Sequence, residues 1–336
     1  LVWLVVGLAP TLIAEPPASI SHAIAAQPPT YMILALGLEA LWRTLEKRWR
    51  YTGAALVSLI LIAHGVLGAY AYFFTWANAP QVQQLHQSGV TTIARQLDAA
   101  EAPGAVAVGA PYVNAWHPWN VVSFELALRR DDVSVRWFNP AGGWVWPAGD
   151  GSTTYYFPQA PLGPQSFHPL LEDLFHADAA PVPTTHQRVT AFRVDSPAAL
   201  EARLAAQPTP ALAWPPEMTP QPAPQTPLDF GDRFALLGIE LLTPSVQPGG
   251  DVQFLTYWQT LTANPAPVVA FAHLTSNGQD LWGQQDWLDV WADGLQPGDR
   301  FVQIHSLPVD SQTPPGTYHL ALGLYNPQTL DRIPVV

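Results

Sequence analysis

The chain has 336 residues, of which 48% are apolar and only 12% are charged. With 36 prolines and a formal net charge of -12 at pH 7, this composition excludes a highly charged disordered tail and an ordinary cytosolic enzyme, and the length favours two or three domains. Cysteine is absent, which excludes disulfide scaffolds, thiol nucleophiles and cysteine-ligated metal sites. The acidic balance argues against a nucleic-acid partner.

The N-terminal stretch LVWLVVGLAPTLIA starts with Leu rather than Met and is apolar from its first residue. It lacks the basic region that a signal peptide carries. We therefore expect the chain to be the C-terminal piece of a longer protein, in which Leu1 to about Ala14 is a membrane span that runs outward.

The strongest membrane signal is the run from Gly53 to Trp76, because these 24 residues contain no formal charge. At a rise of about 1.5 Å per residue, such a run can cross a hydrocarbon core about 30 Å thick. Aromatic side chains, which favour the headgroup level, crowd its far end at Tyr70, Tyr72, Phe73, Phe74 and Trp76. The pattern predicts a transmembrane helix that ends near Trp76.

The preceding run from Thr30 to Trp42 is shorter and contains Glu39, so by itself it suits a buried helix as well as a span. Residues 43–50, between the two runs, hold four of the chain's fourteen basic side chains. The positive-inside rule places such a loop in the cytoplasm. We expect about three spans in residues 1–76, at the end of a longer bundle, and an extracytoplasmic chain after about residue 77. The alternative is a soluble protein with two unusually apolar helices.

The loop EPPASISHAIAAQPP, between the first two expected spans, carries a family resemblance. Followed by an apolar helix, a basic loop, a final span and an acidic outer part, it resembles the C-terminal end of bacterial lipid-carrier-dependent glycosyltransferases. These are the dolichyl-phosphate-mannose-mannosyltransferase-like enzymes of the GT-C fold. Glu15, Ser19 and Pro28 match the late outer loop of that family, whereas His22 stands at its arginine and Ala25 at its glycine.

This resemblance implies a multi-pass protein of the bacterial cytoplasmic membrane with a polyprenyl-phosphate sugar as donor and a glycan or protein as acceptor. It implies a lipid-phosphate or substrate loop at Glu15, Ser19 and His22, although an imidazole contacts phosphate more weakly than a guanidinium at neutral pH. Solvated loop residues are the alternative interpretation of Glu15 and His22. Enzymes of this kind carry their catalytic acidic residues in an early outer loop, which this chain lacks, so no catalytic residue is assigned.

Residues 77–205 predict an extracytoplasmic α/β domain. Helical spacing over Val82 to Ala100 leads to the strand GAVAVG, and the helix WNVVSFELALRR leads to the strand VSVRWF, which together favour a partly parallel sheet. TTYYF and VTAFRV add strands, and SPAALEARL predicts a capped helix from Ser196. The stretch PAGGWVWPAGDG is interpreted as two turn clusters around a short apolar piece, because it lacks the pattern of a phosphate loop.

The stretch GAPYVNAWHPWN follows the first strand, where α/β sheets usually bind ligands. Tyr112, His117 and Trp119 are therefore candidates for sugar contacts. The competing interpretation is that these aromatic side chains and the histidine pack the loop against the domain.

The segment 206–227 is rich in proline and predicts an extended linker. Residues 228–336 then predict an antiparallel β-sandwich, similar to the outer sandwiches that follow the spans in the same glycosyltransferases. The expected strands are FALLGIELL, DVQFLTYWQTL, VVAFAHLTS, QDLWGQQD, RFVQIHSLPV, TYHLALGLYN and RIPVV.

Trp282, Asp286, Trp287 and Trp291 form a further candidate sugar site, because indole rings stack on sugars and carboxylates accept hydrogen bonds from their hydroxyl groups. One of these tryptophans can instead fill the core between the sheets. His273 and His305 are expected to be packed or surface residues, and no residue spacing predicts a metal site.

The function that these patterns favour is the C-terminal fragment of an integral-membrane glycosyltransferase that lacks its catalytic N-terminal part. We expect no cofactor in this fragment, and the divalent-metal requirement of the whole enzyme stays open. The alternative is a non-enzymatic, membrane-anchored surface protein whose sandwich binds glycans or a protein. A soluble hydrolase is not supported, because no nucleophile elbow or positioned carboxylate pair is present.

Overall fold

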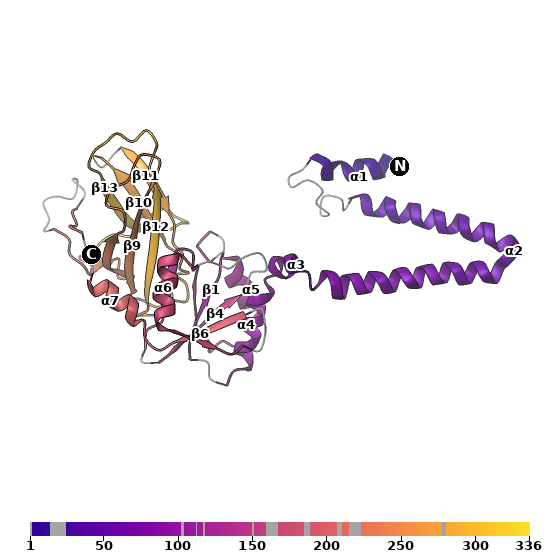
Figure 1. Ribbon diagram of the computed structural model, residues 1–336, viewed down its shortest axis with the longest axis horizontal. Helices are drawn as coiled ribbons and strands as arrows, with labels where there is room; N and C mark the ends of the chain where they lie inside the picture. Colours follow the sequence, from indigo (N-terminus) through magenta and orange to yellow (C-terminus); the bar gives the residue numbers. More distant parts are fainter. Residues whose placement is uncertain are drawn as a thin grey trace. The chain divides into compact units, whose positions relative to one another are not determined.

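The computed structural model describes residues 2–13, 25–101, 104–111, 113–116, 118–149, 151–158, 167–184, 189–206, 210–214, 223–276 and 280–336. The chain divides into two compact units, Leu1–Ala79 and Pro80–Val336. Figure 1 shows that the first consists of helices and the second of sheets with helices on their faces. Each unit is described by itself below.

The first unit contains α1 (Val2–Ile13), α2 (Gln27–Tyr70) and a π-helical turn, η2 (Ala71–Trp76). α2 begins with prolines in its first turn, where a missing N–H costs nothing. Its backbone is helical throughout, although Figure 1 draws it with a sharp turn between two straight arms. The expected loop at residues 43–50 is therefore wrong. This segment lacks glycine and proline and continues the helix instead.

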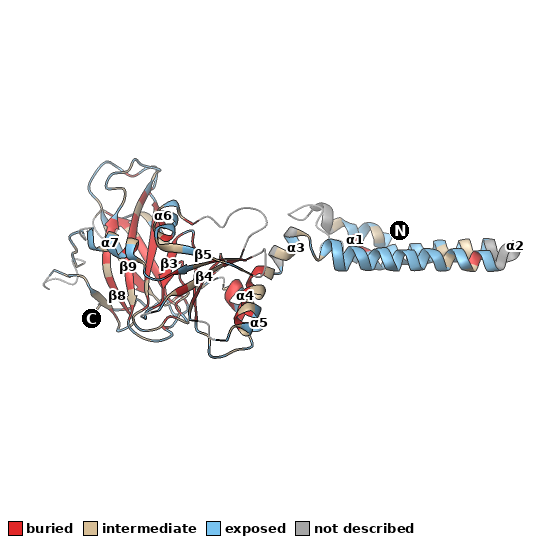
Figure 2. Cartoon of the chain, turned by 60° about the horizontal axis from the view of Figure 1, so that its bottom comes forward, coloured by how far each residue is buried: buried red, intermediate tan, exposed pale blue. Residues whose placement is uncertain are grey.

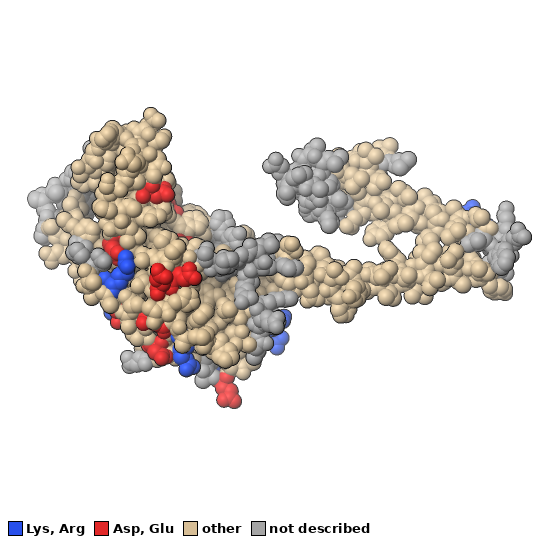
Figure 3. All heavy atoms as spheres, viewed as in Figure 1, with Lys and Arg blue, Asp and Glu red and all other residues tan. Residues whose placement is uncertain are grey.

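The helical run Tyr51–Trp76 is 26 residues long and has a mean hydropathy of 2.0, and none of its apolar window is buried. It is the one helix of the described residues that is long and apolar enough to cross a membrane. On the face drawn in Figure 3 this arm carries no acidic or basic side chain, and Figure 2 shows it exposed along most of its length.

The other two expected spans do not meet this criterion. α1 has 12 residues, which at about 1.5 Å per residue fall short of a hydrocarbon core. The first arm of α2 carries Glu39 and Arg43, whose exposed side chains form an ion pair at 2.6 Å. Length and composition thus support one span rather than three.

The second unit begins with two short helices where one was expected. α3 (Pro80–Leu85) and α4 (Ser88–Ala99) are separated at Gln87, which has a positive φ of 51°. The predicted helix over Val82 to Ala100 is therefore interrupted, because this backbone conformation cannot continue a right-handed helix.

The predicted α/β elements follow. The structure confirms β1 (Ala105–Gly109), α5 (Trp119–Ala127), β2 (Val135–Phe138), β4 (Thr153–Pro158) and β6 (Val189–Val194). It adds α6 (Pro169–Asp178) and β5 (Ala179–Val182). α7 (Ala198–Ala206) starts two residues after the predicted Ser196, and its cap is the Asp178 carboxylate, which accepts a hydrogen bond from the Ala199 N–H at 2.8 Å.

Sheet A has the strand order β2-β1-β4-β6-β5. β1 pairs in parallel with β2 and β4, whereas β6 pairs antiparallel with β4 and β5. The sheet is therefore partly parallel, as predicted. Apolar side chains of α4 and α5, including Ile93, Leu97 and Phe124, bury one of its faces.

Two antiparallel sheets make the sandwich. Sheet B has the order β3-β12-β9-β8-β7 and sheet C the order β11-β10-β13. Their strands are β3 (Gly143–Trp146), β7 (Leu228–Phe230), β8 (Phe234–Leu241), β9 (Asp251–Thr260), β10 (Val269–Thr275), β11 (Leu281–Asp286), β12 (Arg300–Pro308) and β13 (His319–Tyr325). The predicted strand RIPVV is wrong: it contributes isolated bridges, from Arg332 to Tyr325 and from Val335 to Phe230.

β3 joins the α/β part to the sandwich. It lies within PAGGWVWPAGDG, for which turns around a short apolar piece were predicted, and it pairs antiparallel with the distant β12, with Phe301 opposite Val145. α6 and α7 pack on the same side of sheet B (Figure 1), and Phe175 and Leu200 share one buried cluster with Tyr257 and Val302. The expected α/β domain and the expected sandwich thus share a core. The predicted linker began one residue too early, because Ala206 is the last residue of α7, and its other described parts, 210–214 and 223–227, form no helix and no strand.

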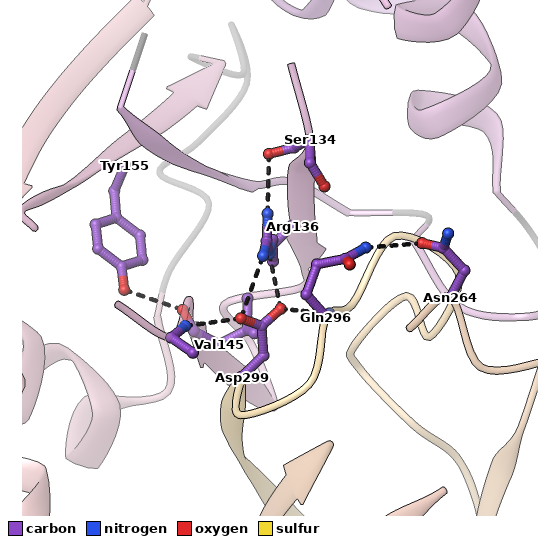
Figure 4. Close-up of polar contacts among 8 residues, drawn as sticks. Ser134, Arg136, Val145, Tyr155, Asn264, Gln296 and Asp299 are labelled. Atoms are coloured by element: carbon purple, nitrogen blue, oxygen red, sulfur yellow. Dashed lines mark hydrogen bonds and ion pairs between the residues drawn. The ribbon is translucent and has the colours of Figure 1, made fainter. Parts of the chain in front are cut away.

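A buried ion pair fastens the same junction (Figure 4). The Arg136 guanidinium of β2 donates to both carboxylate oxygens of Asp299, at 2.7 and 3.2 Å. The backbone N–H groups of Ala148 and Gln296 donate to the same carboxylate, each at 2.7 Å. Asp299 is fully buried, and its carboxylate accepts four hydrogen bonds. Its role is therefore structural: it links β2 of sheet A to the segment that precedes β12.

Candidate functional site

Five of the predicted site residues lie outside the described residues: Glu15, Ser19, His22, Tyr112 and His117. The candidate lipid-phosphate loop and most of the candidate loop after β1 are therefore left as predictions. The remaining candidates, Trp119, Trp282, Asp286, Trp287 and Trp291, can be placed.

Trp119 is the first residue of α5 and is 58% exposed. The loop before Trp119 lies close to the segment between β11 and β12. Ala115 of this loop lines a small enclosed space together with Trp291 and Asp293 of that segment. That segment runs along the edge of sheet A: the Trp291 N–H donates to the Trp137 carbonyl at 3.0 Å. Trp291 is therefore a packing residue at the side of the α/β part, and this space is too tight to hold a water molecule.

An acidic pair lies at this corner. Partial burial and, to a smaller extent, the negative charge of Asp293 raise the pKa of Glu125 above its ordinary value. Two neighbouring carboxylates repel a further anion.

Trp287 supports a buried carboxylate. Its indole N–H donates to Asp289 at 2.8 Å, and the side chains of Asn139 and Gln303 donate to the same carboxylate at 2.7 and 3.0 Å. Burial raises the pKa of Asp289, and these hydrogen bonds oppose the rise. Trp287 therefore serves a polar network inside the unit.

Trp282 lies at an open hollow on the edge of the sandwich. The hollow has a volume of about 350 Å³. It is lined by the first residues of β11 and by the end of β12 with the two residues that follow it: Leu281, Trp282, Gly283, Gln284, Pro308, Val309 and Asp310. The Trp282 indole packs against the buried cluster between the sheets, lies edge-on to Tyr318 at 6.4 Å, and donates to the Ser276 hydroxyl at 3.3 Å. It is the tryptophan of the three that closes the sandwich core.

Asp286 belongs to a group of side chains on the outer face of sheet C, which we call the sheet C cluster: Phe271, His273, Asp286, Tyr325 and Arg332. The His273 Nε2 atom lies 3.5 Å from Asp286, and the Tyr325 hydroxyl donates to Asp286 at 3.5 Å. Burial, followed by the Asp286 charge and hydrogen bond, raises the pKa of Tyr325. These groups come from all three strands and from the C-terminal segment.

The position of the Phe271 ring in the sheet C cluster depends on a glycine, Gly323. Phe271 lies opposite Gly323 in the β10–β13 pairing, and a Cβ atom at Gly323 would come within 2.4 Å of the Phe271 ring. The Arg332 guanidinium lies over this ring, 5.0 Å from its centroid. A glycine inside a strand often marks such a close approach, and this signal in the sequence could have located the cluster.

The sheet C cluster combines an aromatic ring, a carboxylate, an imidazole and a guanidinium, all at least partly accessible except the ring itself. Such groups can hydrogen-bond the hydroxyl groups of a sugar or hold an acidic substituent. Among the described residues no group of three His, Asp or Glu side chains can hold a metal ion.

Comparison with protein-family models and with curated proteins finds no match to this chain.

Proposed function

We propose that the chain is the C-terminal part of an integral-membrane glycosyltransferase, which transfers a sugar from a polyprenyl-phosphate carrier to an extracytoplasmic acceptor. The observation that carries the proposal is the charge-free helix Tyr51–Trp76, followed directly by a compact unit that starts at Pro80. The membrane helix supports access to a lipid-linked donor, and the family-like loop from Glu15 adds the link to sugar transfer.

Within this proposal, the Tyr51–Trp76 helix anchors the chain in the membrane, and residues 80–336 contribute to acceptor binding outside it. The described residues offer no metal cluster, and their buried carboxylates, Glu240, Asp289 and Asp299, accept hydrogen bonds from neighbouring donors. The family resemblance assigns proton transfer from the acceptor hydroxyl group to acidic residues of an early outer loop.

Topology is the first test. A reporter fused after Asn78 should be active only outside the cytoplasm, and a reporter inserted within residues 44–50 should be active only inside. The reverse pattern would contradict the orientation, and cytoplasmic activity at both positions would contradict the Tyr51–Trp76 span.

Sugar transfer is the second test. Membranes that contain the full open reading frame should transfer label from a polyprenyl-phosphate sugar to extracytoplasmic material, and removal of residues 80–336 should lower transfer while the anchor still inserts. Absence of transfer from polyprenyl-phosphate-linked sugars, with the intact protein correctly inserted, would contradict the proposal.

A second candidate function is glycan binding by a membrane-anchored surface protein, which the sheet C cluster favours. In that case the membrane-inserted protein should bind a glycan array without transferring sugar, and Asp286→Asn should weaken binding because it removes the charge that faces His273. Ser311→Ala, outside the cluster, is the matched control. Binding that is equal in both variants would exclude the cluster as the binding face.

A further inference from the structure

The outer face of α5 carries an apolar stripe that nothing in the described structure covers. Trp119, Val122 and Leu126 are 58%, 45% and 84% exposed, and Trp116 just before the helix is 45% exposed. Positions separated by three and four residues share one face of a helix. A stripe of this kind is unusual on the surface of a soluble unit, where large apolar side chains are normally scattered.

α5 also lies close, along the chain, to the end of the membrane helix. Only ten residues, 77–86, separate Trp76 from Gln87, and even fully extended they reach no more than about 35 Å. The Gln87 and Ser123 side chains are hydrogen-bonded, and α5 packs against α4, which follows Gln87 (Figure 1). The covalent connection thus limits how far α5 can lie from the end of the membrane helix.

We propose that this stripe of α5 lies in the interfacial layer of the bilayer, on the side where residue 77 leaves it. The inference rests on the proposed membrane placement of Tyr51–Trp76 and adds a second, peripheral membrane contact. Tryptophan favours this layer because its ring is apolar and its N–H is polar. A helix in this position buries its apolar face about 5–10 Å into the headgroup and acyl boundary.

The contact depends on apolar burial rather than on charge. Residues 77–336 hold ten basic and twenty-three acidic side chains, so the second unit as a whole is repelled by anionic lipids. Glu125, on α5 itself, is one of these acidic side chains. We therefore expect the contact to persist at about 1 M salt, where charges more than about 3 Å apart are screened.

The absence of cysteine makes the test direct, because each introduced cysteine is the only one in the chain. Leu126→Cys, in the full chain reconstituted in liposomes, would carry an environment-sensitive fluorophore, and lipids with nitroxide-labelled chains would serve as quenchers. Gly65→Cys reports the membrane helix, since nothing lies within 4 Å of a Cβ atom there. Leu330→Cys, 69% exposed in the sandwich part, is the matched control.

We expect quenching at Leu126→Cys and Gly65→Cys, at low and at high salt, and none at Leu330→Cys. Quenching at Gly65→Cys without quenching at Leu126→Cys would overturn this inference and leave the membrane helix in place. A blue-shifted but unquenched fluorophore at Leu126→Cys would mean that protein covers the stripe, which also overturns it. Loss of quenching at Gly65→Cys would overturn the membrane placement on which both proposals rest.

Discussion

Two buried carboxylates in the segment between β11 and β12 hold the second unit together in different ways. Asp299 faces the Arg136 guanidinium and two backbone N–H groups. Asp289, ten residues earlier, faces only the neutral side chains of Trp287, Asn139 and Gln303. Both contact the α/β part, through Arg136 and Asn139.

The difference shows two solutions to the cost of burying a charge. An ion pair neutralises the carboxylate but makes each partner depend on the other, because a lone buried charge is very unfavourable. Neutral donors leave the carboxylate with part of its desolvation cost, which raises its pKa. Asp289 fits this case, since burial is the main cause of its raised pKa.

The largest expected effect is that of Asp299→Ala. This variant leaves the Arg136 side chain, only 10% exposed, without a counter-charge, and it deprives Ala148 and Gln296 of their acceptor. Breaking a buried pair typically costs about 3–5 kcal/mol. Urea titration of the detergent-solubilised chain, followed by near-ultraviolet circular dichroism, would measure the lower midpoint.

The double variant Arg136→Met with Asp299→Ala is the control for this prediction. Removal of the orphaned guanidinium should recover part of the lost free energy of unfolding, although the two N–H groups stay unpaired. A double variant no more stable than Asp299→Ala would show that the uncompensated charge is not the source of the loss.

Asp289→Asn should have a smaller effect. The retained Oδ1 oxygen can still accept from Trp287 and Asn139, but the new amide nitrogen faces the Gln303 amide, a donor opposite a donor. Leaving buried donors unsatisfied costs about 1–3 kcal/mol. The same urea titration at pH 7 would measure it.

The pH dependence of this loss follows from the raised pKa of Asp289. The folded state holds the carboxyl proton more tightly than the unfolded state, so wild-type stability falls as pH rises from the ordinary value of 3.8 through the folded pKa. The asparagine variant has no carboxyl group at this position and therefore lacks this pH-dependent contribution to the free energy of unfolding. Its deficit should therefore be larger on the acid side of that window than at pH 7, and a deficit that grows with pH would contradict the assigned direction.

Local sequence patterns were enough to predict the helices and strands whose partners are close in the chain or whose apolar residues recur regularly. β1, α5 and β2 follow from alternating helical and strand patterns. α6 was missed although it carries signals that were available: Pro169 in its first turn, and Leu171 and Phe175 one turn apart on its buried face.

Features that depend on distant pairing could not be predicted in this way. β3 is a four-residue strand between turn clusters, and it is stabilised by β12, more than 150 residues later in the chain. The partner of Asp299, Arg136, lies 163 residues away, and no local pattern connects them. Among the candidate site residues, Asp286 was predicted, but its neighbours His273, Tyr325 and Arg332 come together only through the pairing of sheet C.

The smallest expected effect concerns an ion pair that joins the same two parts at the surface. Glu201 of α7 lies 3.2 Å from Arg300 of β12, and their side chains are 48% and 38% exposed. Exposed pairs contribute about 0–1 kcal/mol because water screens both charges, so Glu201→Gln should barely move the urea midpoint. Glu240→Gln is the matched comparison: Glu240 also meets an arginine of the same region, Arg203, but its side chain is only 6% exposed and also accepts from Tyr257. If the two variants cost the same, burial does not set the strength of these ion pairs, and the large loss expected for Asp299→Ala loses its physical basis.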